Sequence, residues 1–599
     1  MKELNFPFDE KAIMKYRRKL KKQLLADGSL RIKKKIAVLG GSTTNDVVTA
    51  LELFLLNNGI HPEFYQTEYN KFYEEAVFGS EALKAFSPDI IYIHTTSRNI
   101  TFFPDNTSDS PEQIQQRVDD QFNYFKQIWI KLAQDFSCPI IQNNFELPLC
   151  RHTGNYDGWG YYGKSAFINR LNVMFSDYAR KINGFYINDI NYLSACCGLE
   201  RWHSSENWYL YKYAMSLDVV PDLAYNIACI IKSIYGKNKK VIDLDLDNTL
   251  WGGVIGDDGQ EGIEIGQETA VGQSFSEFQS FIKEYKNFGI LLAICSKNDE
   301  ENALLGLNHP ESILKPNDFI SVKANWENKD HNIEQSALEL NLLTDSFVFV
   351  DDNPAECAII EAQLPTVQVI NLTSVGDAMY KLSRNGFFEV TSLSADDLKR
   401  NEMYAANAKR NSQQKCFENY NDYLLSLNMN ATIEDFKPVY LQRITQLTNK
   451  SNQFNLTTKR YSYEDMETVC SSNSYIRLYG KLEDKFGDNG IVSVVIGKCS
   501  DNILHIELWL MSCRVLKRNM EFAMLDELVL QCKKRGITMI MGYYYKTPKN
   551  AMVSKLYENF GFSLINENEN GDSIWQLDTS SYENKNNVIS INKESERPL

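Results

Sequence analysis

The sequence predicts a multidomain α/β protein, because short apolar runs of strand length alternate with helical stretches along the chain. One series of runs begins at residues 36–39, and a second begins at 241–246, directly after the polar segment 236–240. A third series, at 475–511, follows a polar helical stretch at 396–426. Two α/β domains, the first with a parallel sheet, and a third unit built around strands are therefore expected.

Composition and charge exclude several classes of protein. The 599 residues include 63 Lys and Arg against 78 Asp and Glu, and this net charge of -15 argues against binding to nucleic acid or to a membrane surface. The sequence shows neither a signal peptide nor a long apolar run, so a cytoplasmic protein is expected. The 12 cysteines and 7 histidines show no spacing typical of disulfide frameworks or zinc sites.

These patterns give expected domain boundaries. The expected segments are an α/β domain with an N-terminal helix (1–235), a catalytic domain (236–375), a helical connector (376–428), a further domain (429–580) and a disordered tail (581–599).

The strongest chemical signal is DLDLDNTLWGG at residues 243–253, where a buried strand runs into carboxylates and a glycine-rich turn. Carboxylates at such a position are costly unless paired, and Mg²⁺ is a natural partner because it takes oxygen ligands. Two later strands end at Ser296 and at the pair Asp351 and Asp352, and Lys329 lies between them in the sequence. A hydroxyl, an ammonium and further carboxylates at one sheet edge predict a site for Mg²⁺ and a phosphate group.

In this order, these residues resemble the four motifs of the haloacid dehalogenase (HAD) superfamily of aspartate-nucleophile phosphotransferases. The resemblance implies that Asp245 attacks phosphorus, while Asp247 protonates the leaving oxygen and later activates water. The implied Mg²⁺ ligands are Asp245, the Asp247 backbone carbonyl, Asp351 and Asp352. The implied phosphate-binding and substrate-binding residues are Ser296, Lys329, Thr249 and Asn298. Asp243, two residues before the nucleophile, is expected to support the site rather than react.

A narrower resemblance, to the FkbH-like (HAD-IIIC) family, rests on DLDNTLWGGVIGDDG, the phrase 325–329 and FVDDNPAE. Segments 448–458 and 486–490 look like the same family, and the resemblance covers about 239–562. It implies that a glyceryl unit from 1,3-bisphosphoglycerate is dephosphorylated and delivered as a thioester to an acyl carrier protein. The short stretch before the helix near Ser274 leaves little room for a cap domain.

A thioester route needs a carrier thiol and could also use a thiol of the enzyme. Cys513 is the candidate, because it ends an apolar run and is followed by Arg514, which could favour a thiolate. A buried strand cysteine with only a packing role is the alternative interpretation.

The third domain closes with residues 549–562, which resemble the last helix and strand of GNAT acyltransferases, so a GNAT-like α+β fold is expected. The turn that would meet the CoA pyrophosphate, 514–519, has no glycine, which argues against ordinary acetyl-CoA binding. Lys517 and Arg518 could contact the phosphate of a phosphopantetheine arm, or could simply face solvent.

The first domain begins with LGGSTTN at residues 39–45, which resembles the nucleophile block of SGNH hydrolases and implies an SGNH/flavodoxin-like fold. Ser42 would need a histidine, and Asp189 and His203 are the candidate partners, although fourteen residues separate them. A turn that docks a phosphate or a carrier protein is favoured over a hydrolase. For the whole chain, two alternatives stay open: a plain phosphatase acting on a sugar phosphate or cell-envelope precursor, and a carrier-protein docking scaffold.

Overall fold

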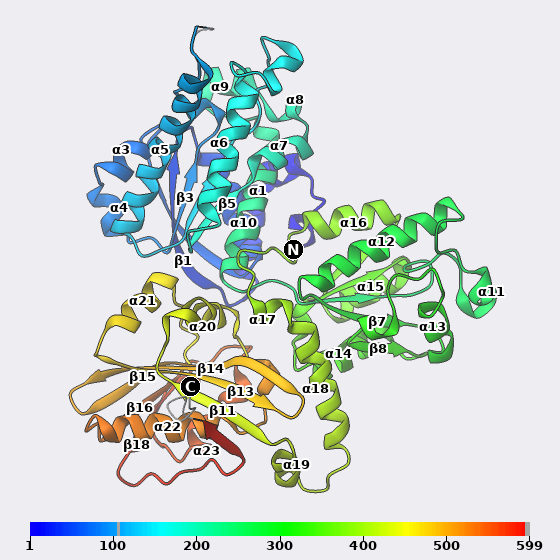
Figure 1. Cartoon of the computed structure of the whole chain (residues 1–599), viewed down its shortest axis with the longest axis vertical. Coiled ribbons are helices and arrows are strands. Elements are labelled where there is room, and N and C mark those ends of the chain that lie inside the picture. The colour runs from blue at the N-terminus through cyan, green and yellow to red at the C-terminus, as the bar shows by residue number, and fades with distance from the viewer. Residues whose placement is uncertain (105–107, 593–599) are drawn as a thin grey trace. The chain divides into compact units, whose positions relative to one another are not determined.

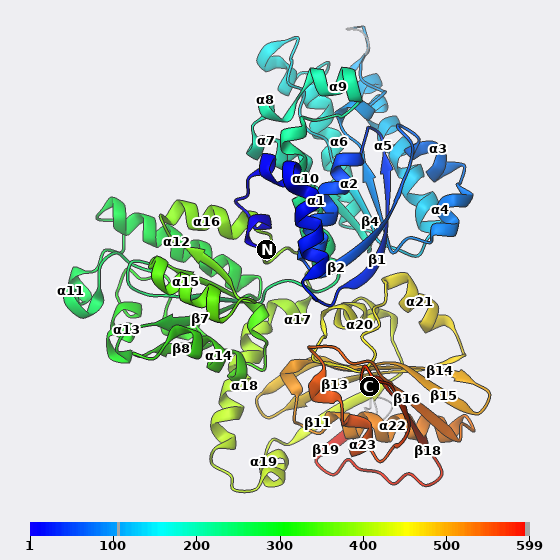
Figure 2. The same cartoon turned by 180° about the vertical axis from the view of Figure 1, so that it is seen from behind.

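In the computed structural model, which describes residues 1–104 and 108–592, the chain divides into two units (Figures 1 and 2). One unit comprises Met1–Ile234 with Ser462–Asp465, and the other comprises Tyr235–Tyr461 with the chain from Met466 onward. None of the helices in the described ranges is long and apolar enough to cross a membrane.

The first unit is built on a five-stranded parallel sheet in the order β2-β1-β3-β4-β5, which is the flavodoxin-like order. The strands are β1 (Ile32–Gly40), β2 (Ile60–Gln66), β3 (Ile90–His94), β4 (Ile140–Asn143) and β5 (Phe185–Asn188). The helices are α1 (Glu10–Ala26), α2 (Asn45–Asn57), α3 (Phe72–Val77), α4 (Glu81–Phe86), α5 (Pro111–Asp135), α6 (Lys164–Ala179), α7 (Ile190–Cys197), α8 (Leu199–Trp202), α9 (Ser205–Tyr211) and α10 (Val220–Ile234). Ala37 and Leu39 of β1 share one core cluster with α5 and α6, as their alternation along the strand requires.

The second unit begins with another five-stranded parallel sheet, in the order β10-β9-β6-β7-β8. Its strands are β6 (Val241–Leu244), β7 (Leu291–Ser296), β8 (Ser321–Ala324), β9 (Phe347–Asp351) and β10 (Gln368–Asn371). Its helices are α11 (Ile255–Gly262), α12 (Ala270–Asn287), α13 (Glu300–Leu307), α14 (Lys329–Glu339), α15 (Pro354–Gln363) and α16 (Val375–Arg384). Only turns and the eight-residue α11 lie between β6 and α12, so no cap domain is inserted there.

Helices α17 (Ala395–Leu398), α18 (Arg400–Gln414) and α19 (Tyr420–Ser426) connect this domain to a nine-stranded mixed sheet. Its strands are β11 (Met429–Glu434), β12 (Phe454–Asn455), β13 (Tyr475–Asp484), β14 (Gly487–Ser500), β15 (Ile503–Met511), β16 (Met539–Tyr544), β17 (Ser563–Glu567), β18 (Ser573–Asp578) and β19 (Ile589–Asn592). The helices are α20 (Pro438–Lys450), α21 (Tyr463–Ser471), α22 (Met520–Lys534) and α23 (Leu556–Asn559). Antiparallel β13, β14 and β15 lead through α22 into β16, which pairs in parallel with β15, and this is a GNAT-like fold.

The expectation of a disordered tail from residue 581 is wrong for the described part of that segment. Strand β19 pairs in parallel with β11, and Val588 and Ile589 are buried in the core of the third domain. The Asp526 carboxylate accepts hydrogen bonds from the Tyr582 hydroxyl (2.6 Å) and the Lys585 backbone N–H (2.9 Å). A few apolar residues in a polar segment are enough to anchor it once an open sheet edge is available. Residues 593–599 lie outside the described ranges.

Candidate active site

Three carboxylates meet at the carboxyl edge of the β6–β9 pair. Asp245 directly follows β6, Asp351 is the last residue of β9 and Asp352 comes next. One carboxylate oxygen from each of the three lies within 4.8 Å of the others. The Asp245 backbone N–H donates to the Val350 carbonyl at 3.0 Å, which holds the two strand ends together.

Lys329, the first residue of α14, neutralises part of this charge. Its Nζ lies 2.9 Å from an Asp245 carboxylate oxygen and 2.6 Å from an oxygen of Asp351, and its side chain is only 3% exposed. Burial lowers the pKa of Lys329, but the charges of Asp245 and Asp351 outweigh burial and hold the pKa above its ordinary value. The ammonium is therefore charged and available to a phosphate oxygen.

Asp247 is held in one orientation two residues after Asp245. Its Oδ1 accepts hydrogen bonds from the Trp251 indole N–H (2.9 Å) and the Ile255 backbone N–H (3.0 Å), and its Oδ2 accepts from the Asn298 amide (2.9 Å). Burial raises the pKa of Asp247, which suits a group that must donate a proton.

The donor set fits a hard divalent cation. Oδ1 of Asp245 is buried and accepts no hydrogen bond from the described residues. Burial, and then the Asp245 charge, raise the pKa of Asp351 to about 6, and burial also raises the pKa of Asp352. Close carboxylates with one ammonium between them carry excess negative charge, which a cation with oxygen ligands would balance.

The other implied site residues lie near the same edge. Ser296 ends β7 and is buried, and Asn298 follows two residues later. Thr249 is fully buried, and its hydroxyl has no partner in the part of the chain that the structure describes. Both carboxylate oxygens of Asp243 are likewise unpartnered, and burial raises the pKa of Asp243 to about 7.

Two tryptophans belong to this region, although the sequence reasoning gave neither of them a role. Trp251 is fully buried and orients Asp247 through its indole N–H. Trp326 is 70% exposed in the loop between β8 and α14, and its indole N–H donates to Asp299 at 2.9 Å. In the sequence, the available signal was a tryptophan two residues after a strand whose carboxyl end lies at the site edge.

Cys513 is not brought to this centre. It packs against the core cluster that includes Val241 and Phe347, the first residues of β6 and β9. Cys513 therefore lies near the amino edge of the sheet, whereas Asp245 and Asp351 lie at the carboxyl edge. Its thiol lies 3.4 Å from the hydroxyl of the buried Tyr404.

In the basic turn that follows Cys513, Arg518 was expected either to contact a phosphate or to face solvent, and it does neither. Arg518 is neither solvent-facing nor available to an external phosphate, because it is buried, lies 3.2 Å from Asp484 and donates to Asn489. Lys517 is exposed and has a left-handed backbone conformation with φ of 64°.

The expected partners of Ser42 do not form a catalytic set. Ser42 is buried, and its hydroxyl has no hydrogen-bond partner among the described residues. His203 Nε2 lies 3.0 Å from the Leu147 carbonyl, while Asp189 caps α7 and accepts from Asn144 at 2.7 Å. Ser42, Asp189 and His203 are thus not linked, because the histidine and the aspartate are each engaged elsewhere.

The parallel sheet, with its carboxylates and Lys329 at the carboxyl edge, defines a HAD-type phosphatase domain. A family model described as "FkbH, N-terminal domain" matches residues 35–232. The chain is also similar to the solved N-terminal part of the protein BF1531 from Bacteroides fragilis, which contains a phosphatase domain and is complexed with Mg. That match has 30% identity and a TM-score of 0.57, and covers 63% of this chain and 99% of that chain. The chain belongs to the same family as this phosphatase-domain protein.

Two other similar structures each cover about a quarter of this chain. The ribosomal-protein-S18-alanine N-acetyltransferase from Escherichia coli is 15% identical, with coverage of 26% of this chain and 96% of that chain and a TM-score of 0.21. The PaiA N-acetyltransferase from Thermoplasma acidophilum, in complex with coenzyme A, is 16% identical, with coverage of 25% and 99% and a TM-score of 0.19. No curated protein matches the chain.

Proposed function

We propose that this chain is a Mg²⁺-dependent HAD-type phosphatase whose substrate is a phosphorylated acyl unit carried to it as a thioester. The observation that supports the phosphatase chemistry is the contact of Lys329 with both Asp245 and Asp351, beside an oriented Asp247. The Mg in the similar Bacteroides fragilis protein supports Mg²⁺ as the cation. In this chain Asp245, Asp351, Asp352 and the Asp247 backbone carbonyl would hold it.

The chain's own residues account for both halves of the reaction. A carboxylate oxygen of Asp245 attacks phosphorus, the bond from phosphorus to the substrate oxygen breaks, and Asp247 gives its proton to that oxygen. Asp247 then takes a proton from water as the water oxygen attacks the phosphorylated Asp245, which releases phosphate. Lys329 and Ser296 bind the phosphoryl oxygens throughout, and bound Mg²⁺ would supply further positive charge to them.

The acyl part of the proposal concerns a glyceryl unit. The thiol of an acyl carrier protein attacks the acyl carbon of a 1,3-bisphosphoglycerate-like substrate, and the phosphate at position 1 leaves as a thioester forms. Asp245 then removes the remaining phosphate from the thioester. The absence of a cap between β6 and α12 supports a substrate on a macromolecular carrier, because the carrier itself can cover the site.

The position of Cys513 bears on where the acyl unit is held. Because Cys513 lies near the opposite edge of the sheet, it is not placed to present a phosphate directly to Asp245. The proposal therefore assigns the dephosphorylation step to an acyl group on the carrier thiol, and any thioester on Cys513 would be a separate stage.

Intact-mass spectrometry tests this function. The full chain is mixed with Mg²⁺, enzymatically generated 1,3-bisphosphoglycerate and a panel of holo acyl carrier proteins. We expect a glyceryl mass on a carrier, and a phosphoglyceryl mass when Asp245→Asn replaces the wild-type chain; a Cys513→Ala variant should load the carrier normally. Phosphate release without any acyl adduct would favour the plain phosphatase, and turnover by Asp245→Asn would refute the nucleophile assignment.

A further inference from the structure

A second charged site lies in the same unit, in a cavity of about 100 Å³ near Cys513. The helical connector, α20 and the turn after β15 line it together with residues of the parallel-sheet domain. The segment 448–458, singled out in the sequence, contributes residues 450–454 to the wall. The phosphatase chemistry uses none of these residues.

Cations outnumber carboxylates around this cavity. The basic lining residues are Lys240, Arg400, Arg443, Lys450, Arg514 and Lys549. The acidic lining residues are Asp345, Asp396 and Asp397. Six cations against three carboxylates leave three positive charges unbalanced by the lining side chains.

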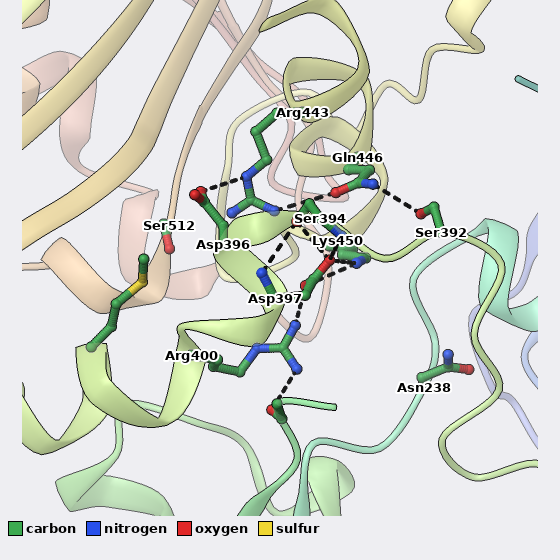
Figure 3. Close-up of polar contacts among 12 residues, drawn as sticks. Asn238, Ser392, Ser394, Asp396, Asp397, Arg400, Arg443, Gln446, Lys450 and Ser512 are labelled. Carbon is green, nitrogen blue, oxygen red and sulfur yellow. Dashed lines mark hydrogen bonds and ion pairs between the residues drawn. The ribbon is translucent and has the colours of Figure 1, made fainter. Parts of the chain in front are cut away.

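The three carboxylates are already engaged, and Figure 3 shows the contacts of two of them, Asp396 and Asp397. Asp397 accepts from Arg400 and lies 3.1 Å from the Lys450 ammonium, and Asp396 lies 2.9 Å from the Arg443 guanidinium. Asp345, the third carboxylate, pairs with Lys549. Each carboxylate therefore has at least one cation of its own.

Two cations of the lining are left without a close carboxylate. Arg514 has only a distant contact with Asp396, at 3.9 Å. Lys240 forms no ion pair within the described ranges, and its charge acts on Asp345 only as a minor cause of the lowered pKa of that carboxyl. The positive charges of these two side chains are thus not cancelled by a carboxylate in close contact.

Burial makes the excess of positive charge around the cavity energetically unfavourable. Burial lowers the pKa of Lys450 to about 8, and burial together with the Arg514 charge lowers the pKa of Arg443 to about 10. Both pKa values are lowered, which means that the surroundings of these side chains disfavour their positive charge. An anion in the cavity would remove this penalty, because buried charges are stable only when paired.

The cavity is separate from the phosphatase centre. Lys240 and Ser346 line it and directly precede β6 and β9, whereas Asp245 and Asp351 lie at the other ends of these strands. Five residues of extended chain, from Lys240 to Asp245, span about 16 Å. Apolar side chains, including Phe454 and Met511, form another part of the wall.

We propose that this cavity binds a phosphate ester, with its phosphate beside Lys240, which has no ion pair among the described residues, and Lys450, which shares Asp397 with Arg400, and with its uncharged part toward Cys513. This goes beyond the proposed function, since it adds a second phosphate-binding position and does not depend on turnover at Asp245. The ester could be a free small molecule or the phosphopantetheine arm of a carrier protein. A cavity of about 100 Å³ accepts a phosphate-sized group, since a water molecule takes ~30 Å³.

The test uses the thiol of Cys513 as a reporter. The full-length Asp245→Asn chain, which should not hydrolyse the ligands, is alkylated with iodoacetamide, and modification is followed peptide by peptide by mass spectrometry. We expect 4′-phosphopantetheine and glycerol 3-phosphate to slow alkylation of Cys513 but not of the exposed Cys416. Pantetheine without phosphate should protect Cys513 much less at the same concentration. Equal protection by pantetheine, or no protection by either ester, would overturn the proposal.

Matched variants separate ligand binding from a purely structural ion network. Lys240→Gln and Lys450→Gln should each raise the half-protecting concentration of phosphate ester about tenfold. Lys459→Gln is the control, because Lys459 is 47% exposed and pairs with Glu507 outside the cavity, much as the 33% exposed Lys450 pairs with Asp397. Unchanged protection in both cavity variants, with unchanged melting temperatures, would overturn the proposal.

Two further protection experiments identify the source of the phosphate ester. Protection by a holo carrier protein but not by its apo form would assign the site to the phosphopantetheine arm. Protection by the small esters alone would assign it to a free phosphorylated molecule.

Discussion

The ammonium of Lys329 lies 2.6 Å from a carboxylate oxygen of Asp351, and both side chains are closed to solvent. Such a buried contact holds the start of α14 to the end of β9. Because the same ammonium lies 2.9 Å from Asp245, one side chain serves both the fold and the chemistry.

Replacing Lys329 with methionine should therefore reduce both stability and rate. We expect kcat for a phosphate monoester to fall about 100-fold, since one charge on the phosphoryl group is lost. The free energy of unfolding should fall by about 3 kcal/mol, because Asp351 is left buried without its partner. Lys323→Met is the control, as Lys323 pairs with Glu339 at the surface and should cost under about 1 kcal/mol. Turnover and chemical denaturation measure the two effects, and equal losses in both variants would refute the assignment.

Metal binding gives a prediction for Asp352. Asp352→Asn should raise the Mg²⁺ concentration needed for half-maximal activity about tenfold or more, because a neutral amide replaces one anionic ligand candidate. EDTA should abolish activity of the wild-type chain, and added Mg²⁺ should restore it. Asp257→Asn, on the exposed surface of α11, should behave as the wild type in the same titration. An unchanged Mg²⁺ dependence in Asp352→Asn would remove Asp352 from the ligand set.

The phosphatase centre could be predicted from the sequence because each of its residues ends a strand, follows a strand or begins a helix. Parallel strands place their carboxyl ends at one edge, so the order of Asp245, Ser296, Lys329 and Asp351 along the chain was enough to bring them together. The alternation of strands and helices predicted two α/β domains, and a parallel sheet in the first of them.

Residues whose role depends on contacts between distant segments could not be placed in this way. Arg518 looks like a surface residue in the sequence, but the turn after β15 buries it against Asp484 of β13. The amino-edge position of Cys513 depends on how the third domain packs against β6 and β9, which no local pattern encodes. Strand β19 pairs with β11, about 160 residues earlier in the sequence.

The buried Glu146 should make the stability of the first unit depend on pH. Its side chain is fully buried, the Ser97 hydroxyl donates to it at 2.8 Å, and burial raises its pKa to about 7. Between the unfolded value of 4.5 and this pKa, the folded state binds more protons, so stability falls as pH rises through that window. The full effect is about 3 kcal/mol above pH 7.

Glu146→Gln should remove this loss, since an amide oxygen still accepts from Ser97 and carries no charge. We expect the variant to be more stable than the wild type at pH 8 and similar at pH 5, as measured by denaturant unfolding of the full chain at both values. The exposed Glu81→Gln serves as the control and should leave the difference between the two pH values as in the wild type. A variant less stable than the wild type at pH 8 would show that the buried charge is favourable.

A buried ion pair between Arg410 and Asp484 fixes the connector to the third domain. Arg410 of α18 forms two hydrogen bonds with Asp484, at 2.8 and 2.6 Å, and both side chains are at most 2% exposed. Arg410→Met should lower the free energy of unfolding by about 3 kcal/mol, because the buried Asp484 keeps only the longer contact with Arg518 as a cationic partner, besides the Phe486 backbone N–H. The surface pair of Arg180 and Asp177 provides the control, and Arg180→Met should cost under about 1 kcal/mol. Since Arg518 lies in the turn that follows Cys513, Arg410→Met should also speed alkylation of Cys513 while leaving phosphatase turnover unchanged. A loss of turnover would mean that the connector also affects the structure of the Asp245 centre.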